Sequence, residues 1–173
     1  FLKTIQLEPL VSEKTYVWDI FIRIFHWGLT VCLAGAWLSV EQGWMDWHQT
    51  FGLAALGLII FRVLWGVAGP AYARFSHFIR SPKATLVYAR DLLSGRESHY
   101  LSHNPLGALA VLGLLGLVGF QVVSGLFATD DVLFEGPLFP MVSYDNSLLL
   151  TELHETSFNV LLGIVGLHIL AVL

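Results

Sequence analysis

Long apolar stretches alternate with shorter polar segments along the whole chain. Crossing ~30 Å of hydrocarbon takes about 20 helical residues. Four apolar stretches reach that length: residues 17–40, 47–69, 105–128 and 149–173. Asn104 and Pro105 open the third stretch with the side-chain cap and first-turn proline that favour a helix start. The pattern predicts an all-α integral membrane four-helix bundle, formed as a single domain over residues 1–173.

The composition favours the bilayer as the surrounding solvent. Of the 173 residues, 55% are hydrophobic and 13% are charged, whereas soluble domains carry about 25% charged residues. The single cysteine, Cys32, excludes a disulfide within the chain, and no Cys-x-x-Cys-His motif offers covalent haem attachment. One thiol also cannot hold an iron–sulfur cluster. Redox chemistry in this chain would therefore need a non-covalent cofactor.

The basic residues all lie on one side of the predicted spans: Lys3, Lys14, Arg23, Arg62, Arg74, Arg80, Lys83, Arg90 and Arg96. The charged residues of the other side are all acidic: Glu41, Asp46, Asp130, Asp131, Glu135, Asp145, Glu152 and Glu155. Because Lys and Arg concentrate in cytoplasmic loops, we expect both termini and the loop 70–104 to be cytoplasmic. This loop is amphipathic. Its simplest interpretation is a helix on the inner leaflet, and docking of a soluble partner is the alternative.

Four of the seven histidines fall within or at the edge of the predicted spans: His26, His48, His154 and His168. Each alone could be a core histidine bonded to a carbonyl, but an ionisable residue at membrane depth is also a functional candidate. His154 and His168 are 14 residues apart, which places them on nearly the same helix face and about 21 Å apart in depth. The fourth span therefore offers one ligand at each of two levels.

The predicted topology supplies a second histidine at each level, pairing His26 with His168 inside and His48 with His154 outside. Two bis-histidine levels in a helical bundle suit two b-type haems, and they leave outer-sphere electron transfer as the chemistry. Zinc is disfavoured because the pairs lie too far apart for one tetrahedral site. A proton relay is disfavoured because the spans lack partner carboxylates. A non-redox membrane transporter or metal sensor nevertheless remains the competing class.

Arg62 follows His48 by the same 14 residues and should face the same side at the inner level. It could bind a propionate of the inner haem, or it could extend to the lipid headgroups, and both interpretations stay open. His77, His99 and His103 lie in the inner loop, where a solvated or interfacial position is expected.

Several sequence blocks resemble the prokaryotic cytochrome b561 family, which includes the cytochrome b subunits of nickel–iron hydrogenases. The matching blocks are Phe21-Ile22-Arg23-Ile24-Phe25-His26-Trp27, His48 with Gly52, Phe61-Arg62 with Trp65-Gly66, His103-Asn104-Pro105-Leu106-Gly107, His154-Glu155 and Gly166-Leu167-His168. The resemblance extends over essentially the whole chain. It implies a four-helix dihaem cytochrome of the bacterial inner membrane that exchanges electrons with the quinone pool. The family's haem ligands match His26, His48, His154 and His168.

The resemblance also suggests partners. Hydrogenase-type members are electron-transfer subunits of an oxidoreductase, whereas one other kind oxidises superoxide by itself. A mouth that collects superoxide should be positive, and the acidic outer side makes this the lesser alternative. That side suits a periplasmic c-type cytochrome or oxidoreductase subunit with a basic patch, docking over residues 129–148. The acidic charge could equally follow from the topology rule alone, with residues 129–148 as a plain connection. No nucleic-acid partner is expected, and a homodimer stays open.

A quinone site requires an apolar slot with a hydrogen-bond donor. Gln121 and Ser124 are polar residues near the outer level, and Ser102 and His103 lie near the inner level. Polar residues within spans more often form hydrogen bonds between helices, so none of these residues is assigned to the site.

Overall fold

The computed structural model describes residues 19–96 and 104–173. Four long helices dominate it: α1 (Ile20–Glu41), α2 (Met45–Ala68), α5 (Pro105–Gly125) and α6 (Tyr144–Val172). All four are long and apolar enough to cross a membrane, which confirms the predicted all-α membrane four-helix bundle. The residues outside the described part include Lys3, Lys14, His99, Ser102 and His103. The cytoplasmic placement of the termini stays a prediction.

Two helix boundaries at the outer end differ from the sequence-based ranges by three residues or more, because polar groups there determine where the helices begin and end. The fourth helix begins at Tyr144 rather than 149, since the Ser143 side chain caps it by accepting from the Asn146 backbone N–H. The third long helix ends at Gly125 rather than 128. Just beyond it, the Leu126 and Ala128 carbonyls accept hydrogen bonds from the outer loop instead of continuing a helix.

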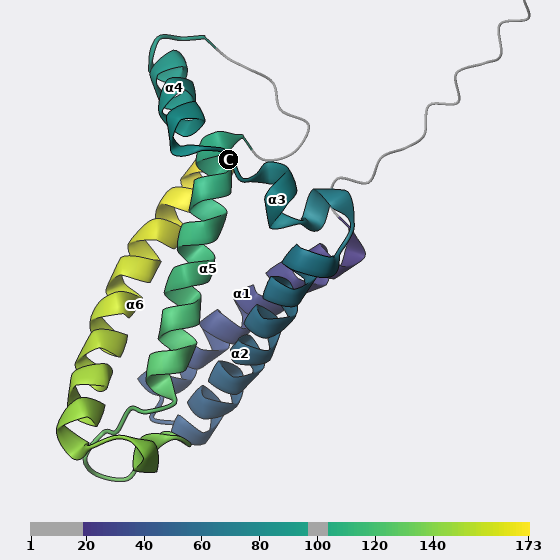
Figure 1. Ribbon diagram of the computed structural model, residues 1–173. Helices are drawn as coiled ribbons and strands as arrows, with labels where there is room; N and C mark the ends of the chain where they lie inside the picture. Colours follow the sequence, from purple (N-terminus) through teal and green to yellow (C-terminus); the bar gives the residue numbers. More distant parts are fainter. Residues whose placement is uncertain (1–18, 97–103) are drawn as a thin grey trace, which may run out of the picture.

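The long helices form two hairpins, α1 with α2 and α5 with α6, which are joined mainly through contacts between α2 and α5. Figure 1 shows the hairpins close together at the end with the α5–α6 connection and diverging toward the end that carries α3 and α4. Gly35 allows close packing of α1 on α2, since a Cβ atom there would lie 2.7 Å from the Phe51 ring. The buried core lies between the hairpins: Phe25, Cys32, Ala55, Ile59, Val118, Val122 and Leu161.

The segment between α2 and α5 contains short helices: η1 (Ala71–Ala73), α3 (Phe75–Phe78) and α4 (Pro82–Leu93). Ser81 caps α4 by accepting from the Ala84 backbone N–H, and Pro82 takes the first helical position that suits proline. Phe78 is buried, so part of this amphipathic segment packs on the bundle, whereas Leu93 is almost fully exposed.

Phe75 anchors α3 against α2 at Gly66, where an added Cβ atom would overlap the Phe75 ring. Replacing Gly66 with alanine should displace that ring and destabilise the protein by about 1–3 kcal/mol, as overpacking does. Thermal unfolding in detergent measures this loss. Gly57→Ala is the matched control, because a Cβ at this glycine of the same helix meets nothing within 4 Å. Equal stability of the two variants would contradict the packing described here.

The outer connection between α5 and α6 is a structured loop that includes the short helix η2 (Phe139–Met141). One carboxylate oxygen of Asp130 accepts from the backbone N–H groups of Val132, Leu133 and Phe134 at 2.9, 2.9 and 2.7 Å. These bonds hold a tight turn whose tip, Leu133, is 94% exposed. The loop thus presents a fixed apolar tip beside acidic residues on the predicted outer side.

The same backbone N–H bonds, from Phe134 first and then Val132 and Leu133, hold the pKa of Asp130 below its ordinary value. Because the folded pKa is lowered, the carboxylate supports the turn fully above an unfolded pKa of about 3.9. That support is lost as pH falls through the lowered folded pKa. Amide hydrogen exchange of residues 132–134, corrected for intrinsic rates, should therefore be protected at pH 5 and lose protection near pH 2. Unchanged protection in Asp130→Asn at pH 5 would refute the role of the carboxylate.

Candidate functional site

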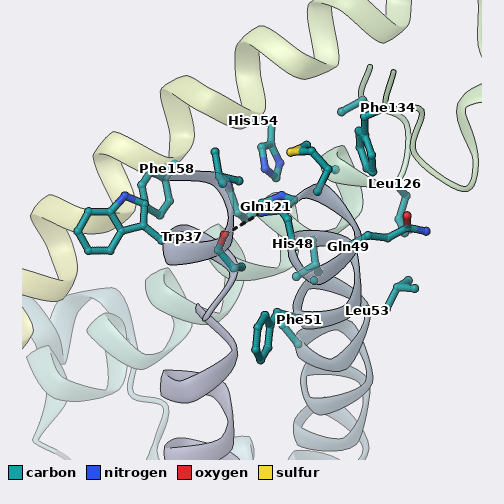
Figure 2. A pocket seen from close by; sticks show the side chains of 18 of the residues that line it. Trp37, His48, Gln49, Phe51, Leu53, Gln121, Leu126, Phe134, His154 and Phe158 are labelled. Carbon is teal, nitrogen blue, oxygen red and sulfur yellow. Dashed lines mark hydrogen bonds between the residues drawn. The ribbon is translucent and has the colours of Figure 1, made fainter. Parts of the chain in front are cut away.

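Two histidine rings face one another near the outer end of the bundle. His48 lies in the first turn of α2 and His154 lies in α6, 106 positions later in the chain. Their ring centroids are 6.1 Å apart and the ring planes meet at 80°. Figure 2 shows both side chains side by side at a cavity that they help to line. The structure therefore brings together the two histidines that the sequence had paired at the outer level.

Each ring of this pair is held through its Nδ1 atom. The Nδ1 atom of His48 lies 3.0 Å from the Ala36 carbonyl oxygen, which can only accept. The Nδ1 atom of His154 lies 3.1 Å from the Ser124 hydroxyl, which itself donates to the Phe120 carbonyl at 2.8 Å. The Ala36 carbonyl requires the proton of His48 on Nδ1, which leaves the Nε2 lone pair of that ring available. A Ser124 hydroxyl that donates to Phe120 accepts from Nδ1 of His154 in the same way. Metal-ligating histidines are commonly held in this way.

The cavity beside the pair has a volume of about 260 Å³ and is mainly apolar. Its walls include Leu33, Trp37, Phe51, Val122 and Phe158. Gly52 also lines it, and an added Cβ there would meet nothing within 4 Å. An apolar cavity with a few convergent polar groups is typical of cofactor sites.

The spacing of the two rings fits ligation of one metal ion from opposite sides. Two imidazoles that would each bind one metal ion through a ring nitrogen at about 2.0–2.1 Å would have ring centres ~6 Å apart. The observed separation is 6.1 Å. This spacing and the Nδ1 bonds are compatible with two histidines that would hold one haem.

The second pair lies toward the other end of the bundle. His26 in α1 and His168 in α6 are both half-buried and lie close enough to interact electrostatically. They come from helices that are not neighbours in either hairpin, so only the assembled bundle brings them together. Fourteen residues of α6 separate this pair from the outer one.

Arg62 is a buried cation on α2, with only 5% of its surface exposed. Its guanidinium carbon lies 4.6 Å from the centroid of the Phe75 ring, and the Nη1 group is buried without a hydrogen-bond partner in the described part of the chain. Asp19 interacts with it electrostatically, but this carboxylate is hydrogen bonded to Trp65 Nε1 at 3.0 Å. The burial favours a carboxylate ligand over extension to the headgroups.

Gln121 and Ser124, the polar residues near the outer level, form hydrogen bonds between α5 and α6. The Ser157 hydroxyl donates to the Gln121 side-chain oxygen at 2.5 Å, and Ser124 contacts His154. Sequence reasoning missed the Ala36 carbonyl and Gly125. The latter lies so near the His154 ring that an added Cβ would be 3.0 Å from Cε1. The sequence gives no signal for this contact, because Gly125 and His154 lie on different helices.

His77 is the histidine of the inner loop that falls within the described residues. It is exposed and packs against the Tyr72 ring with centroids 4.9 Å apart. Its position relative to the bilayer stays a prediction. Over residues 19–96 and 104–173, no group of three or more His, Cys, Asp or Glu side chains is arranged to hold a metal ion.

Residues 17–173 match the protein family described as prokaryotic cytochrome b561. No curated protein and no solved structure matched the chain. The match assigns b-type haem binding and transmembrane electron transfer to this multi-pass bacterial membrane protein. Its coverage includes all four long helices and both histidine pairs, and on this basis the chain belongs to the prokaryotic cytochrome b561 family.

Proposed function

We propose that this protein carries electrons across the bacterial inner membrane through two b-type haems. His48 and His154 would hold the outer haem, and His26 and His168 would hold the inner one. Arg62 would bind a propionate of the inner haem. The protein then acts as an electron-transfer subunit between the quinone pool and a periplasmic redox partner.

The observation that carries this proposal is the geometry of the outer pair. Two imidazoles from different hairpins stand 6.1 Å apart with both Nδ1 atoms engaged elsewhere. A pair of histidines that only stabilised the core would not need both Nε2 atoms left available. His26 and His168 provide a second pair about 21 Å deeper, because His168 follows His154 by 14 residues on one helix.

The residues restrict the chemistry to electron transfer. When bound, a b-type haem supplies one-electron reduction and oxidation. Two histidines at each level would hold one haem each, and a haem held in this way would supply electron transfer rather than binding of oxygen or a substrate. The apolar walls around the outer pair exclude water, and the buried guanidinium of Arg62 offsets carboxylate charge at the inner level.

The acidic charge of the predicted outer segments indicates where the redox partner would bind. The predicted outer segments contain acidic residues and no Lys or Arg, and the structured loop at Asp130 presents two of these acids beside the exposed Leu133. A periplasmic cytochrome or oxidoreductase subunit with a basic patch would complement this surface. Its electron-transfer rate should fall as salt increases, because exposed charges are screened.

Proteoliposomes test the function. With ferricyanide trapped inside and a membrane-impermeant reductant outside, the protein loaded with haem should reduce the trapped oxidant. The variant His168→Ala should abolish this transfer, whereas His77→Ala, which changes an exposed histidine, should retain it. A quinol added in place of the impermeant reductant should reduce the haems. Equal rates for His168→Ala and the unmodified protein would refute the proposed path.

A further inference from the structure

The two outer histidines differ in what holds them. The Nδ1 atom of His48 is held by a backbone carbonyl, that of Ala36 on α1. The Nδ1 atom of His154 is held by a side chain, the hydroxyl of Ser124 on α5. A side-chain partner can be removed by substitution without disturbing the helix backbone, so its contribution can be measured separately.

The surroundings of Ser124 define what its hydroxyl does. The residue is 1% exposed, so water does not compete for its hydrogen bonds. Its proton is directed to the Phe120 carbonyl at 2.8 Å, with the Gln121 carbonyl at 3.2 Å. The oxygen lone pairs therefore remain for the Nδ1–H group of His154 at 3.1 Å.

Gly125 follows Ser124 on α5 and restricts the position of the His154 ring. Its Cα lies so close to the imidazole that an added Cβ would be 3.0 Å from Cε1 and 3.4 Å from Nδ1 of His154. The ring is thus packed against the α5 backbone and hydrogen bonded to the adjacent serine. Both contacts fix its orientation relative to His48.

We propose that Ser124 is a positioning residue of the outer haem site. It fixes the tautomer and ring orientation of His154 and sets the preference of this site for ferric over ferrous haem. This inference rests on the haem ligation proposed above and concerns a residue to which that proposal gives no role.

The direction of the effect follows from ligand basicity. A hydrogen bond accepted from Nδ1–H raises the electron density of the imidazole and the basicity of Nε2. A more basic ligand favours the ferric state, which carries the greater positive charge. Removing the Ser124 hydroxyl should therefore weaken ferric binding more than ferrous binding and raise the midpoint potential of the outer haem.

The experiment compares Ser124→Ala with Ser157→Ala in the haem-loaded protein. Ser157 is a fitting control because its hydroxyl also links α5 to α6, through Gln121, and it bonds the backbone carbonyl of His154 rather than Nδ1 of the ring. Redox titration followed by visible spectroscopy gives the two midpoint potentials, and electron paramagnetic resonance of the ferric protein reports the ligand orientation. Ser124→Ala should change the ferric-over-ferrous preference of one haem by up to about tenfold, an upward shift of about 59 mV for one electron.

The expected result is a shift of one haem component in Ser124→Ala, in both potential and resonance, and none in Ser157→Ala. Identical potentials and resonances in Ser124→Ala and the unmodified protein would overturn the inference. So would equal changes in the two variants, because these would reflect only helix association.

Ser124→Cys decides the matter if the alanine variant does not fold, since a thiol keeps similar volume but accepts hydrogen bonds weakly. An upward shift of the same haem component supports the inference, and an unchanged potential contradicts it. Failure of the proposed function looks different: the unmodified protein would then lack two haem components before any substitution is made.

Discussion

Replacing His154 with alanine will lower the haem content from about two per chain to about one, because an outer haem with one axial imidazole loses half of its protein ligation. The same haem component should disappear in His48→Ala, since these two rings face one another at 6.1 Å. The other component should disappear in both His26→Ala and His168→Ala. Haem content and redox titration of the purified variants measure both losses.

The grouping of the variants tests the pairing itself. Two substitutions within one pair must remove the same redox component, and two from different pairs must remove different components. His77→Ala serves as the control for loss of an exposed histidine and should retain both haems. If His48→Ala and His168→Ala removed the same component, the assignment of ligands to two depths would be wrong.

Replacing Arg62 with methionine will have opposite effects on the haem-free and haem-loaded protein. Without haem, Arg62 is a buried cation whose Nη1 group has no partner in the described part of the chain. Exchanging such a charge for an apolar side chain often stabilises a fold by about 1–4 kcal/mol. With haem bound, the same exchange removes the partner of a propionate, and inner haem affinity should fall about tenfold or more. Thermal unfolding and haem titration measure the two effects.

Arg23→Met is the matched control, because Arg23 lies toward the same end of the bundle but is exposed. It should change neither haem affinity nor the stability of the haem-free chain by a comparable amount. If Arg62→Met behaved like Arg23→Met in both measurements, the headgroup interpretation of Arg62 would be correct and the propionate interpretation wrong.

The sequence was sufficient to predict the long helices, because each contains a continuous apolar run that is long enough to span a membrane. It was less exact at the outer helix ends. Polar residues such as Ser143 extend α6 beyond the apolar run, and hydropathy carries no information on where a capped helix starts. The relative depth of His154 and His168 was predicted from their spacing, since the rise per residue of a helix is fixed. The levels of His26 and His48 were predicted from the topology.

The partners of the functional side chains were beyond sequence reasoning. The Ala36 carbonyl that holds His48 belongs to another helix, and every residue carries such a carbonyl. The stacking of Phe75 on Arg62 depends on how the chain turns back after α2, which no local pattern specifies. Spacing along one helix is a local property, whereas the groups that orient a ligand come from packing between helices.

The number of haems per chain is the measurement that tests the two-pair assignment most directly. The purified protein, reduced with dithionite, should show the split visible bands of low-spin b-type haem. Extraction and quantitation against protein should give about two haems per chain, and redox titration should resolve two components. A single haem per chain would contradict the assignment of His26–His168 and His48–His154 as two ligand pairs. Retention of two haems after substitution of all four histidines would contradict it as well.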